Sequence, residues 1–220
     1  HYRAGTLLPT QEYFAEKYDV SRITLKKALN LLENDGLVFS KQGSGTYIRP
    51  QIDNSDSELL PLDLPVGVTY SHRDQKISSQ TLSFDARLPL ADEQQNLNIT
   101  ASDPVYEFKR VRSINDQIYS LEHVIMPTQV APLNEEILQG SVYDYLGHVA
   151  KLQLTDARRI IYADQANAEI SAALKIDEGF PILVIEQIAY DQKGTAFEFS
   201  KSYFISNKSK FSLDIHLNRK

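Results

Sequence analysis

Two arginines in the middle of the chain, Arg110 and Arg112, have the spacing of an anion-binding pair. They lie two positions apart in an alternating segment, so a strand would carry both side chains on one face, roughly 7 Å apart. Two guanidinium groups at this spacing can clamp an anionic group through paired hydrogen bonds. The arginines could instead form cross-strand ion pairs with Glu107, Glu122 or Glu198, and the residues alone leave both interpretations open.

A second group of residues has the types needed to contact nucleic acid. Arg22, Lys26 and Asn30 are four positions apart and share one face of a predicted helix. Ser21 and Thr24 lie at the start of this helix, where backbone N–H groups favour phosphate. An ordinary solvated helix face with an N-cap is the alternative interpretation.

A glycine-containing hairpin is predicted shortly after this helix. Gly43 and Gly45 stand between two short apolar runs, and Lys41 and Gln42 precede them. The glycines allow a tight turn and a close backbone approach to a ligand. The order helix, turn, helix and hairpin is that of a winged helix, in which Lys41 and Gln42 would contact phosphate or the minor groove.

The first fifty residues contain clear signals for the elements that position these groups. Thr10 and Ser21 are predicted N-caps of two successive helices. The second helix is predicted to end at Gly36. Its core-facing stripe repeats at helical spacing and consists of Leu25, Ala28, Leu29 and Leu32.

The rest of the chain alternates strands with short helices. One predicted hairpin turns at Asn115-Asp116 and a second at 191–194. The remaining predicted elements are helices near 132–147 and 166–174 and a strand near 152–164. Strand pairs joined by tight turns, with helices between them, predict a mainly antiparallel α+β domain.

Charge and composition divide the chain into two domains. Residues 1–50 hold seven Lys and Arg against five Asp and Glu, whereas residues 51–220 hold sixteen against twenty-four. The basic excess therefore coincides with the predicted DNA-binding segment. The polar, proline-containing stretch 51–65 is predicted to be a linker, which leaves 66–220 as the second domain.

Several function classes find no support in the sequence. The chain has no cysteine, no membrane-length apolar run and no signal peptide, so a cytoplasmic protein without a membrane partner is expected. The five histidines have no metal-ligand spacing, and hydrolase, nucleotide-binding and metalloprotease motifs are absent. No catalytic residue, metal or cofactor is predicted.

The first fifty residues resemble the winged-helix domain of GntR-type bacterial transcription regulators. The resemblance rests on Gly5, Leu8-Pro9-Thr10, Tyr18, Val20-Ser21-Arg22, Thr24-Leu25-Lys26, Ala28-Leu29, Gly36-Leu37 and Gly43-Ser44-Gly45-Thr46. It implies DNA contacts by Thr10, Ser21, Arg22, Thr24, Lys26, Lys41, Gln42, Gly43 and Gly45. Two departures are the lack of the helix that usually precedes Gly5 and the lysine at position 26, where the family often has arginine. Lysine lacks the fork for bidentate guanine recognition, so Lys26 is expected to contact phosphate.

Residues 66–220 are similar to the UTRA effector-binding domain of the HutC subfamily, whose fold resembles chorismate lyase. The similarity rests on Arg110-x-Arg112, Ser141 to Leu146, Ala173 to Ile176, Tyr190-Asp191-x-x-Gly194 and Glu198-Phe199-Ser200. It implies that Arg110, Arg112, Ser141 and Tyr143 hold an anionic effector group. Glu122 and Glu198 would contact sugar hydroxyls. Tyr203 is a candidate for an aromatic wall of the site, with ordinary packing of a strand tyrosine as the alternative.

The sequence thus predicts a homodimeric, effector-responsive transcription factor. The expected partners are palindromic double-stranded operator DNA, a second copy of the chain and a small effector, favoured to be a phosphosugar. The expected role is repression of a carbohydrate-use operon. The alternative is a lyase-like enzyme or small-molecule binding protein with a vestigial DNA-binding domain, for which Arg110, Arg112, Glu122 and Glu198 would supply acid–base groups.

Overall fold

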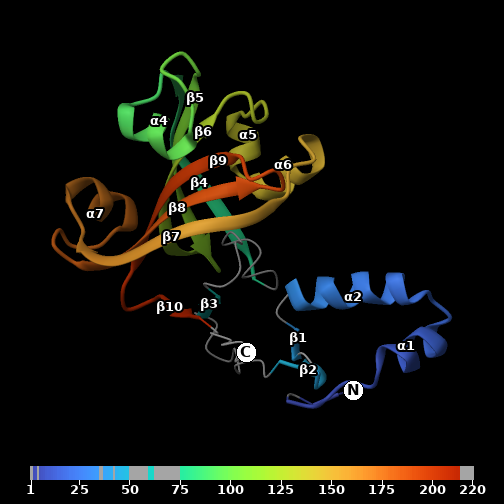
Figure 1. Ribbon diagram of the computed structural model, residues 1–220. Coiled ribbons are helices and arrows are strands. Elements are labelled where there is room, and N and C mark those ends of the chain that lie inside the picture. Colours follow the sequence, from blue (N-terminus) through green and yellow to red (C-terminus); the bar gives the residue numbers. More distant parts are fainter. Residues whose placement is uncertain are drawn as a thin grey trace. The chain divides into compact units, whose positions relative to one another are not determined.

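The computed structural model describes residues 2–3, 5–34, 37–41, 43–49, 59–61 and 75–213. The chain forms two compact units, His1–Leu59 and Leu60–Lys220, which are coloured along the sequence in Figure 1. Among the sequence predictions, those for Gly36, for Gln42 and for most of the linker lie outside the described residues.

The N-terminal unit contains a helix-turn-helix followed by a hairpin. Its elements are α1 (Gln11–Tyr18), α2 (Arg22–Asn34), β1 (Val38–Lys41) and β2 (Gly45–Ile48), and the two strands pair antiparallel. The Thr10 hydroxyl accepts a hydrogen bond from the Tyr13 N–H at 3.3 Å, and the Ser21 hydroxyl accepts one from the Thr24 N–H at 3.1 Å. Both predicted N-caps and the predicted hairpin are confirmed.

The apolar stripe of α2 is only partly buried, contrary to the prediction. Leu25 is buried and Leu29 is half-buried, whereas Ala28 and Leu32 are exposed. Among the described residues, α1 and β1 are the elements that pack against α2 most extensively. These two elements cover only one side of the apolar stripe, so Ala28 and Leu32 remain exposed to solvent.

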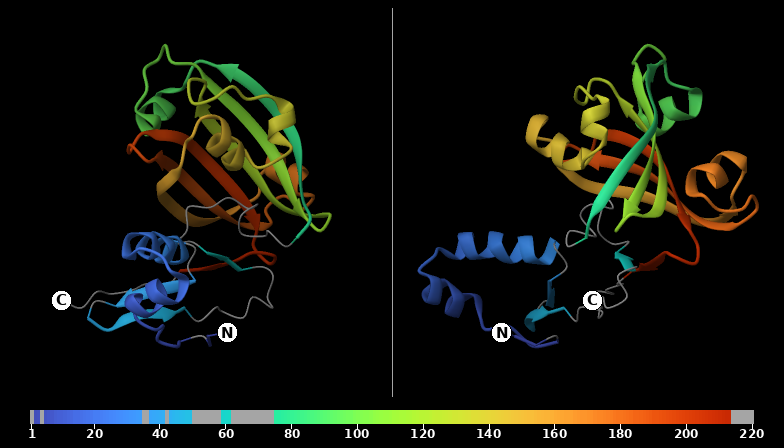
Figure 2. Two further views of the ribbon diagram at one scale, coloured as in Figure 1. Left: turned by 90° about the vertical axis from the view of Figure 1, so that its right-hand side faces the viewer. Right: turned by 180° about the vertical axis from the view of Figure 1, so that it is seen from behind.

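The C-terminal unit is built on a six-stranded antiparallel sheet with the order β4-β5-β6-β9-β8-β7, seen from two further directions in Figure 2. Its strands are β4 (Ile77–Arg87), β5 (Val105–Ile114), β6 (Gln117–Pro127), β7 (Leu154–Gln165), β8 (Pro181–Asp191) and β9 (Ala196–Ile205). A separate two-stranded sheet pairs β3 (Leu59–Pro61) with β10 (Lys210–Ser212). The α+β class with a mainly antiparallel sheet is confirmed.

The predicted hairpins are present because their turn residues adopt the required backbone geometry. Asn115 and Asp116 both have positive φ, 50° and 65°, as a two-residue type I′ turn between β5 and β6 requires. The β8–β9 connection turns at Gly194, whose φ is 76°. These tight turns fix the register that brings the polar side chains of neighbouring strands together.

Helices cover both faces of the sheet (Figures 1 and 2). They are α4 (Ala91–Leu97), α5 (Glu135–Leu138), α6 (Val142–Val149) and α7 (Ala168–Leu174). Leu138 and Leu146 of α5 and α6 share a core with Phe108 of β5, on what we call the α5–α6 face. Leu97 of α4 and Leu174 of α7 pack in two cores on the opposite, α4–α7 face. Because side chains alternate along a strand, even-numbered residues of β5 belong to the first face and odd-numbered residues to the second.

Two predicted helices differ from those observed. The single helix expected over 132–147 is two short helices, because Asn134 and Ser141 each cap a new N-terminus through their side-chain oxygens. The helix expected over 166–174 begins two residues later, after its N-cap Asn167. In both places the side chain of a capping residue bonds the backbone and starts a helix at that point, although the apolar pattern runs through it.

Candidate functional site

The exposed face of α2 is the first candidate site. Arg22, Lys26 and Asn30 are all exposed, as expected for a face that contacts a macromolecule. The Arg22 guanidinium lies 3.5 Å from the Glu12 carboxylate of α1, but these side chains are 75% and 61% exposed. Such a pair is weak and readily exchanged, so Arg22 remains accessible to a phosphate or a base edge.

The hydroxyl groups predicted to contact DNA serve first as helix caps. Ser21 bonds the Thr24 N–H and lies 2.9 Å from the Thr24 hydroxyl oxygen, while Thr10 caps α1. All three residues are exposed. The caps fix the helix starts, and the hydroxyls remain at the surface beside the first-turn N–H groups that attract phosphate.

The hairpin, which we call the wing, is held rigid by local contacts. The rings of Phe39 and Tyr47 stack with centroids 5.4 Å apart, and the Tyr47 hydroxyl lies 2.6 Å from that of Ser44. Lys41 is exposed at the end of β1. Gly45 has a φ of 112°, a value that disfavours any residue with a side chain. The wing thus presents Lys41 and the predicted Gly43 and Gly45 contacts on one stiff turn.

The second candidate site is a buried polar cluster on the α5–α6 face of the C-terminal unit. We define the polar cluster as Arg110, Arg112, Glu122, Tyr143, Gln187 and Glu198. Its strand residues are only 2–8% exposed. Charged side chains are seldom buried to this extent without a partner or a ligand.

Arg110 links the sheet to the loop before α6. Its Nε donates to a Glu122 carboxylate oxygen at 2.6 Å, across the β5–β6 pair. Its Nη1 donates to the carbonyl oxygens of Leu138 and Gly140 at 3.0 and 3.1 Å. One of the cross-strand ion pairs considered as an alternative is therefore present. Arg110 holds the segment between α5 and α6 against the sheet.

Glu198 is the acceptor at the other end of the cluster. Its Oε1 accepts hydrogen bonds from the hydroxyls of Tyr143 and Ser200 at 2.9 and 2.8 Å. The Gln187 side-chain amide donates to the Tyr143 hydroxyl at 3.0 Å and lies 3.3 Å from the same carboxylate oxygen. The cluster thus joins α6 to β8 and β9 by hydrogen bonds.

The two carboxyl groups of the cluster have opposite electrostatic environments. Burial opposes ionisation of Glu122, but the charges of Arg110 and Arg112 outweigh it and lower the pKa of this carboxyl. Burial raises the pKa of Glu198 above its usual range. Burial and the Glu198 charge raise the pKa of the Tyr143 hydroxyl. In this respect the two carboxyls resemble sites in which the surroundings of two carboxyl groups shift their pKa values in opposite directions.

The remaining predicted residues divide between the two faces. Arg112 lies on β5 beside Arg110, and burial lowers the pKa of its guanidinium. Ser141 caps α6 directly after the Gly140 carbonyl that Arg110 contacts. Tyr203 packs against the core of the α4–α7 face. It is five positions from Glu198, and an odd offset along a strand changes the face.

Sequence reasoning did not identify two members of this neighbourhood. Gln187 and Ser200 are opposite each other on β8 and β9 and both bond the cluster. Gln187 belongs to none of the quoted motifs, and Ser200 ends the Glu198-Phe199-Ser200 segment of the family resemblance without having been given a role there. A buried polar residue in a strand is the signal that would have identified them.

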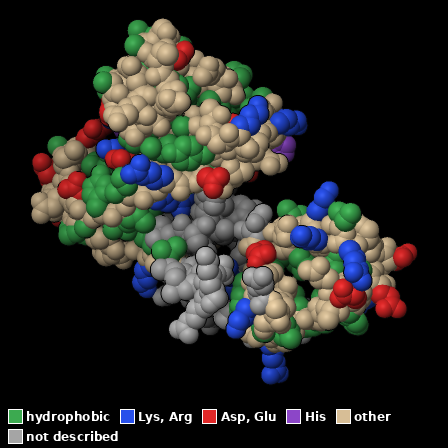
Figure 3. Space-filling view, in the orientation of Figure 1, with side chains coloured by type: hydrophobic (Ala, Val, Ile, Leu, Met, Phe, Trp, Pro, Cys, Tyr) green, Lys and Arg blue, Asp and Glu red, His purple; other side chains and the backbone are tan. Residues whose placement is uncertain are grey.

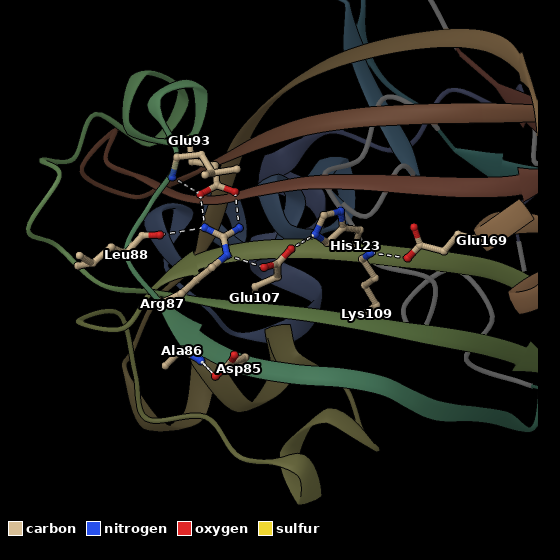
Figure 4. Close-up of polar contacts among 10 residues, drawn as sticks. Asp85, Ala86, Arg87, Leu88, Glu93, Glu107, Lys109, His123 and Glu169 are labelled. Carbon is tan, nitrogen blue, oxygen red and sulfur yellow. Dashed lines mark hydrogen bonds and ion pairs between the residues drawn. The ribbon is translucent and has the colours of Figure 1, made fainter. Parts of the chain in front are cut away.

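The α4–α7 face carries a separate group of ion pairs, which we call the Arg87 network (Figure 4). Arg87 donates from Nη1 and Nη2 to the two carboxylate oxygens of Glu93 and from Nε to Glu107. Glu107 also contacts the His123 ring at 2.7 Å. Arg87 lowers the pKa of Glu107, and for Glu93 its effect outweighs the opposing effect of burial. These contacts fasten α4 to the sheet.

Two further observations concern metal and membrane sites. Within the described part of the chain, no three His, Cys, Asp or Glu side chains gather as a metal site. None of the described helices has the length and apolar character needed to cross a bilayer.

Comparisons with known protein families match each of the two units. Residues 72–210 match the UTRA domain, and residues 1–48 match the family described as bacterial regulatory proteins, gntR family. The chain is 30% identical to the HTH-type transcriptional regulator GmuR of Bacillus subtilis over 89% of this chain and 83% of that protein. It is 31% identical to the mannosyl-D-glycerate transport/metabolism system repressor MngR of Escherichia coli over 96% of this chain and 87% of that protein.

A solved structure is similar to nearly the whole chain. The crystal structure of the possible transcriptional regulator YydK from Bacillus subtilis matches with a TM-score of 0.85 at 28% identity. The match covers 98% of this chain and 93% of that chain. The relatives are transcription regulators by name and not enzymes, so the lyase-like alternative receives no support from them.

Proposed function

The chain belongs to the GntR family of bacterial transcription regulators and carries a UTRA domain, and we propose that it represses a carbohydrate-use operon in the cytoplasm. In this proposal the N-terminal unit binds a palindromic operator as part of a homodimer. A small anionic effector, favoured to be a phosphosugar, binds the polar cluster and releases the operator. MngR, named as a repressor of a mannosyl-D-glycerate transport/metabolism system, supports the carbohydrate assignment.

The DNA-binding step uses α2 and the wing. α2 enters the major groove, where Arg22 reaches a base edge or phosphate and Lys26 contacts phosphate. Lys41 and the glycine turn of the wing follow the adjacent backbone. Two copies of this unit, related by a twofold axis, match the two half-sites of a palindrome.

The charge balance of the polar cluster is the observation that carries the effector proposal. Its two buried guanidinium groups face one carboxylate, Glu122, whose charge is favoured, and one, Glu198, whose charge burial disfavours. Burial thus disfavours one of the two carboxylate charges that face these guanidinium groups. A bound anion would supply negative charge there, and the carboxyl, amide and hydroxyl groups around it suit sugar hydroxyls.

In this proposal, release of the operator depends on the contacts of Arg110. This side chain holds the carbonyls of Leu138 and Gly140, which lie directly before the Ser141 cap of α6. An anion that draws Arg110 toward itself weakens these bonds, and the N-terminus of α6 gains a ligand. Effector binding thus favours a different position of the α5–α6 segment and shifts the population of the dimer.

Operator binding is tested with charge-removal variants on two faces of α2. Arg22→Ala should weaken specific binding in a mobility-shift assay and lower the salt slope of log K by about 1. Lys27→Ala, which removes the same charge from a neighbouring face of α2, is the matched control and should weaken binding less. Equal losses in both variants would contradict the assigned recognition face.

The effector class is tested by thermal shift with hexose phosphates, the corresponding free hexoses and inorganic phosphate. A hexose phosphate at about 100 times its dissociation constant should stabilise the protein by about 2.7 kcal/mol. Arg112→Gln should abolish this shift, whereas Lys76→Gln, which changes an exposed charge, should retain it. Stabilisation by free hexoses alone would refute the phosphosugar assignment.

A further inference from the structure

Gln187 is a buried amide that has a hydrogen-bond partner at each of its two ends. It is 8% exposed. Its Oε1 accepts a hydrogen bond from the Arg159 Nε at 2.7 Å, and its Nε2 donates to the Tyr143 hydroxyl at 3.0 Å. Arg159 lies directly opposite Gln187 on the neighbouring strand β7. The amide therefore connects a cation on the last strand of the sheet with a hydroxyl of α6.

Arg159 fixes the orientation of this amide. A guanidinium group has only donors, whereas an amide has an acceptor oxygen and a donor nitrogen. The amide oxygen must therefore face Arg159, and the nitrogen must face the other way. Both groups next to the nitrogen are acceptors, the Tyr143 hydroxyl oxygen and, at 3.3 Å, Glu198 Oε1. The reverse orientation would place two donors 2.7 Å apart and is excluded.

The orientation of the amide decides where the Tyr143 hydroxyl proton points. A hydroxyl has one proton and two acceptor lone pairs. Because Gln187 donates to the Tyr143 oxygen, the hydroxyl proton is directed to Glu198 Oε1, which lies 2.9 Å away. Hydrogen bonds are thus donated in one direction along a series that we call the Arg159 relay: Arg159, Gln187, Tyr143 and Glu198.

Arg159 is placed differently from a surface cation. Lys and Arg side chains are exposed on the C-terminal unit in Figure 3, and Arg158, its neighbour on β7, is exposed. Arg159 is half-buried and contacts a buried acceptor. Burial and the Glu198 charge raise the pKa of the Tyr143 hydroxyl, and the Arg159 charge opposes this rise. Arg159 therefore acts on the hydroxyl both through the amide and through its charge.

We propose that Arg159 and Gln187 are positioning residues of the effector site, which keep the Tyr143 hydroxyl turned as a donor toward the polar cluster. The inference rests on the proposed function, in which an anionic effector binds this cluster. A bound anion is a strong acceptor and competes with Glu198 for the Tyr143 proton. Without Arg159 the amide can turn over, and its oxygen then takes the same proton. The relay thus preserves a donor for the effector.

The role of Arg159 is tested by binding of glucose 6-phosphate and mannose 6-phosphate to the full chain. Arg159→Met should weaken binding about tenfold, the usual cost of losing one hydrogen bond to a charged group. Arg159→Lys retains a group that can only donate and should bind as the unaltered chain does. Arg158→Met removes the same charge from the other face of β7 and is the matched control. Equal losses in Arg159→Lys and Arg159→Met, or in Arg158→Met and Arg159→Met, would overturn the proposal.

A second substitution separates the orientation of the amide from the charge of Arg159. Leucine at position 187 has no oxygen that could take the Tyr143 proton. The double variant Arg159→Met with Gln187→Leu should therefore bind the two hexose phosphates more tightly than Arg159→Met alone. If Arg159 acted only through its charge or its packing, the double variant would bind no better than the single one, and the relay would be refuted.

The relay is also tested without a ligand, by amide hydrogen exchange in peptides from α6 and β9. In the unliganded chain the Tyr143 hydroxyl bonds Glu198 and so ties α6 to the sheet. Arg159→Met should raise exchange in these peptides. The same substitution should have no such effect in a Tyr143→Phe background, because no hydroxyl proton remains to be redirected. An equal rise in both backgrounds would contradict the relay.

The two kinds of measurement distinguish failure of this inference from failure of the proposed function. If Arg159→Met changes exchange only in the presence of Tyr143, but no hexose phosphate binds the unaltered chain, the relay stands and the phosphosugar assignment fails. If hexose phosphates bind the Arg159 and Gln187 variants as tightly as the unaltered chain, the phosphosugar assignment stands and the positioning role fails.

Discussion

Replacing Arg110 by alanine removes the cation that hydrogen-bonds Glu122 inside the C-terminal unit and leaves Arg112 as the other positive charge acting on this carboxylate. In the folded protein the Arg110 Nε lies 2.6 Å from the Glu122 carboxylate, and the two residues are 7% and 8% exposed. The variant also loses the hydrogen bonds to the carbonyls of Leu138 and Gly140. A buried carboxylate and two carbonyl oxygens would then lack this donor.

The expected cost is large because the partner left behind is charged. Removing one member of a buried ion pair typically destabilises a protein by about 3–5 kcal/mol. For a domain of this size each kcal/mol lowers the unfolding temperature by about 2–4 °C, so Arg110→Ala should lower it by about 6–20 °C. The exposed pair of Lys76 and Asp116 provides the control, and Lys76→Ala should cost at most about 1 kcal/mol.

The assay is thermal unfolding combined with amide hydrogen exchange in peptides from β5 and β6. Exchange resolves the C-terminal unit from the N-terminal one, which a single melting curve does not. The loss should also shrink as the pH falls. Arg110 now lowers the pKa of Glu122, so the wild-type advantage is present at neutral pH and disappears once this carboxyl is protonated.

Two results would refute this reasoning. The first is a loss of stability in Arg110→Ala no larger than that in Lys76→Ala, which would show that the buried pair contributes nothing beyond a surface pair. The second is a double variant, Arg110→Met with Glu122→Leu, whose loss of stability equals the sum of the two single losses, whereas coupling predicts that the double variant recovers much of the stability.

Two further variants test the Arg87 network and the wing. Arg87→Met should destabilise the protein more at pH 7 than at pH 3. The lowered pKa values of the Glu93 and Glu107 carboxyls contribute stability that is lost as the pH falls below about 4. Chemical denaturation at both pH values measures this stability, and equal losses at the two pH values would contradict the prediction. Gly45→Ala should cost about 1–3 kcal/mol in the N-terminal unit because φ is 112° at this position, whereas Gly147→Ala in α6 should be neutral or stabilising. Hydrogen exchange in β2 measures the effect of Gly45→Ala, and unchanged protection there would contradict the prediction.

Local signals account for the parts of the fold that could be predicted. Thr10 and Ser21 cap helices because their hydroxyls reach N–H groups three residues away, a distance set within one turn. The Asn115-Asp116 turn forms a hairpin for a similarly local reason. Predictions failed where longer patterns were extended through a cap, as in the helix expected over 132–147.

The polar cluster was partly predictable because its strand residues alternate. Arg110 and Arg112 share a face by period two, and the resemblance to UTRA domains added Glu122, Tyr143 and Glu198. Gln187 had no such signal, since its role depends on the pairing of β8 with β9.

The sequence by itself determined the two modules of this regulator, the capped helices and wing that present Arg22 and the strand that carries the arginine pair. These features depend on residues within a few positions of one another, so local chemistry specifies them. The tertiary structure alone decided which side chains meet: Arg110 bonds Glu122 and the loop before α6, while Tyr203 lies on the other face. It also decided that β7 is an edge, because strand order depends on pairings between segments far apart in the chain.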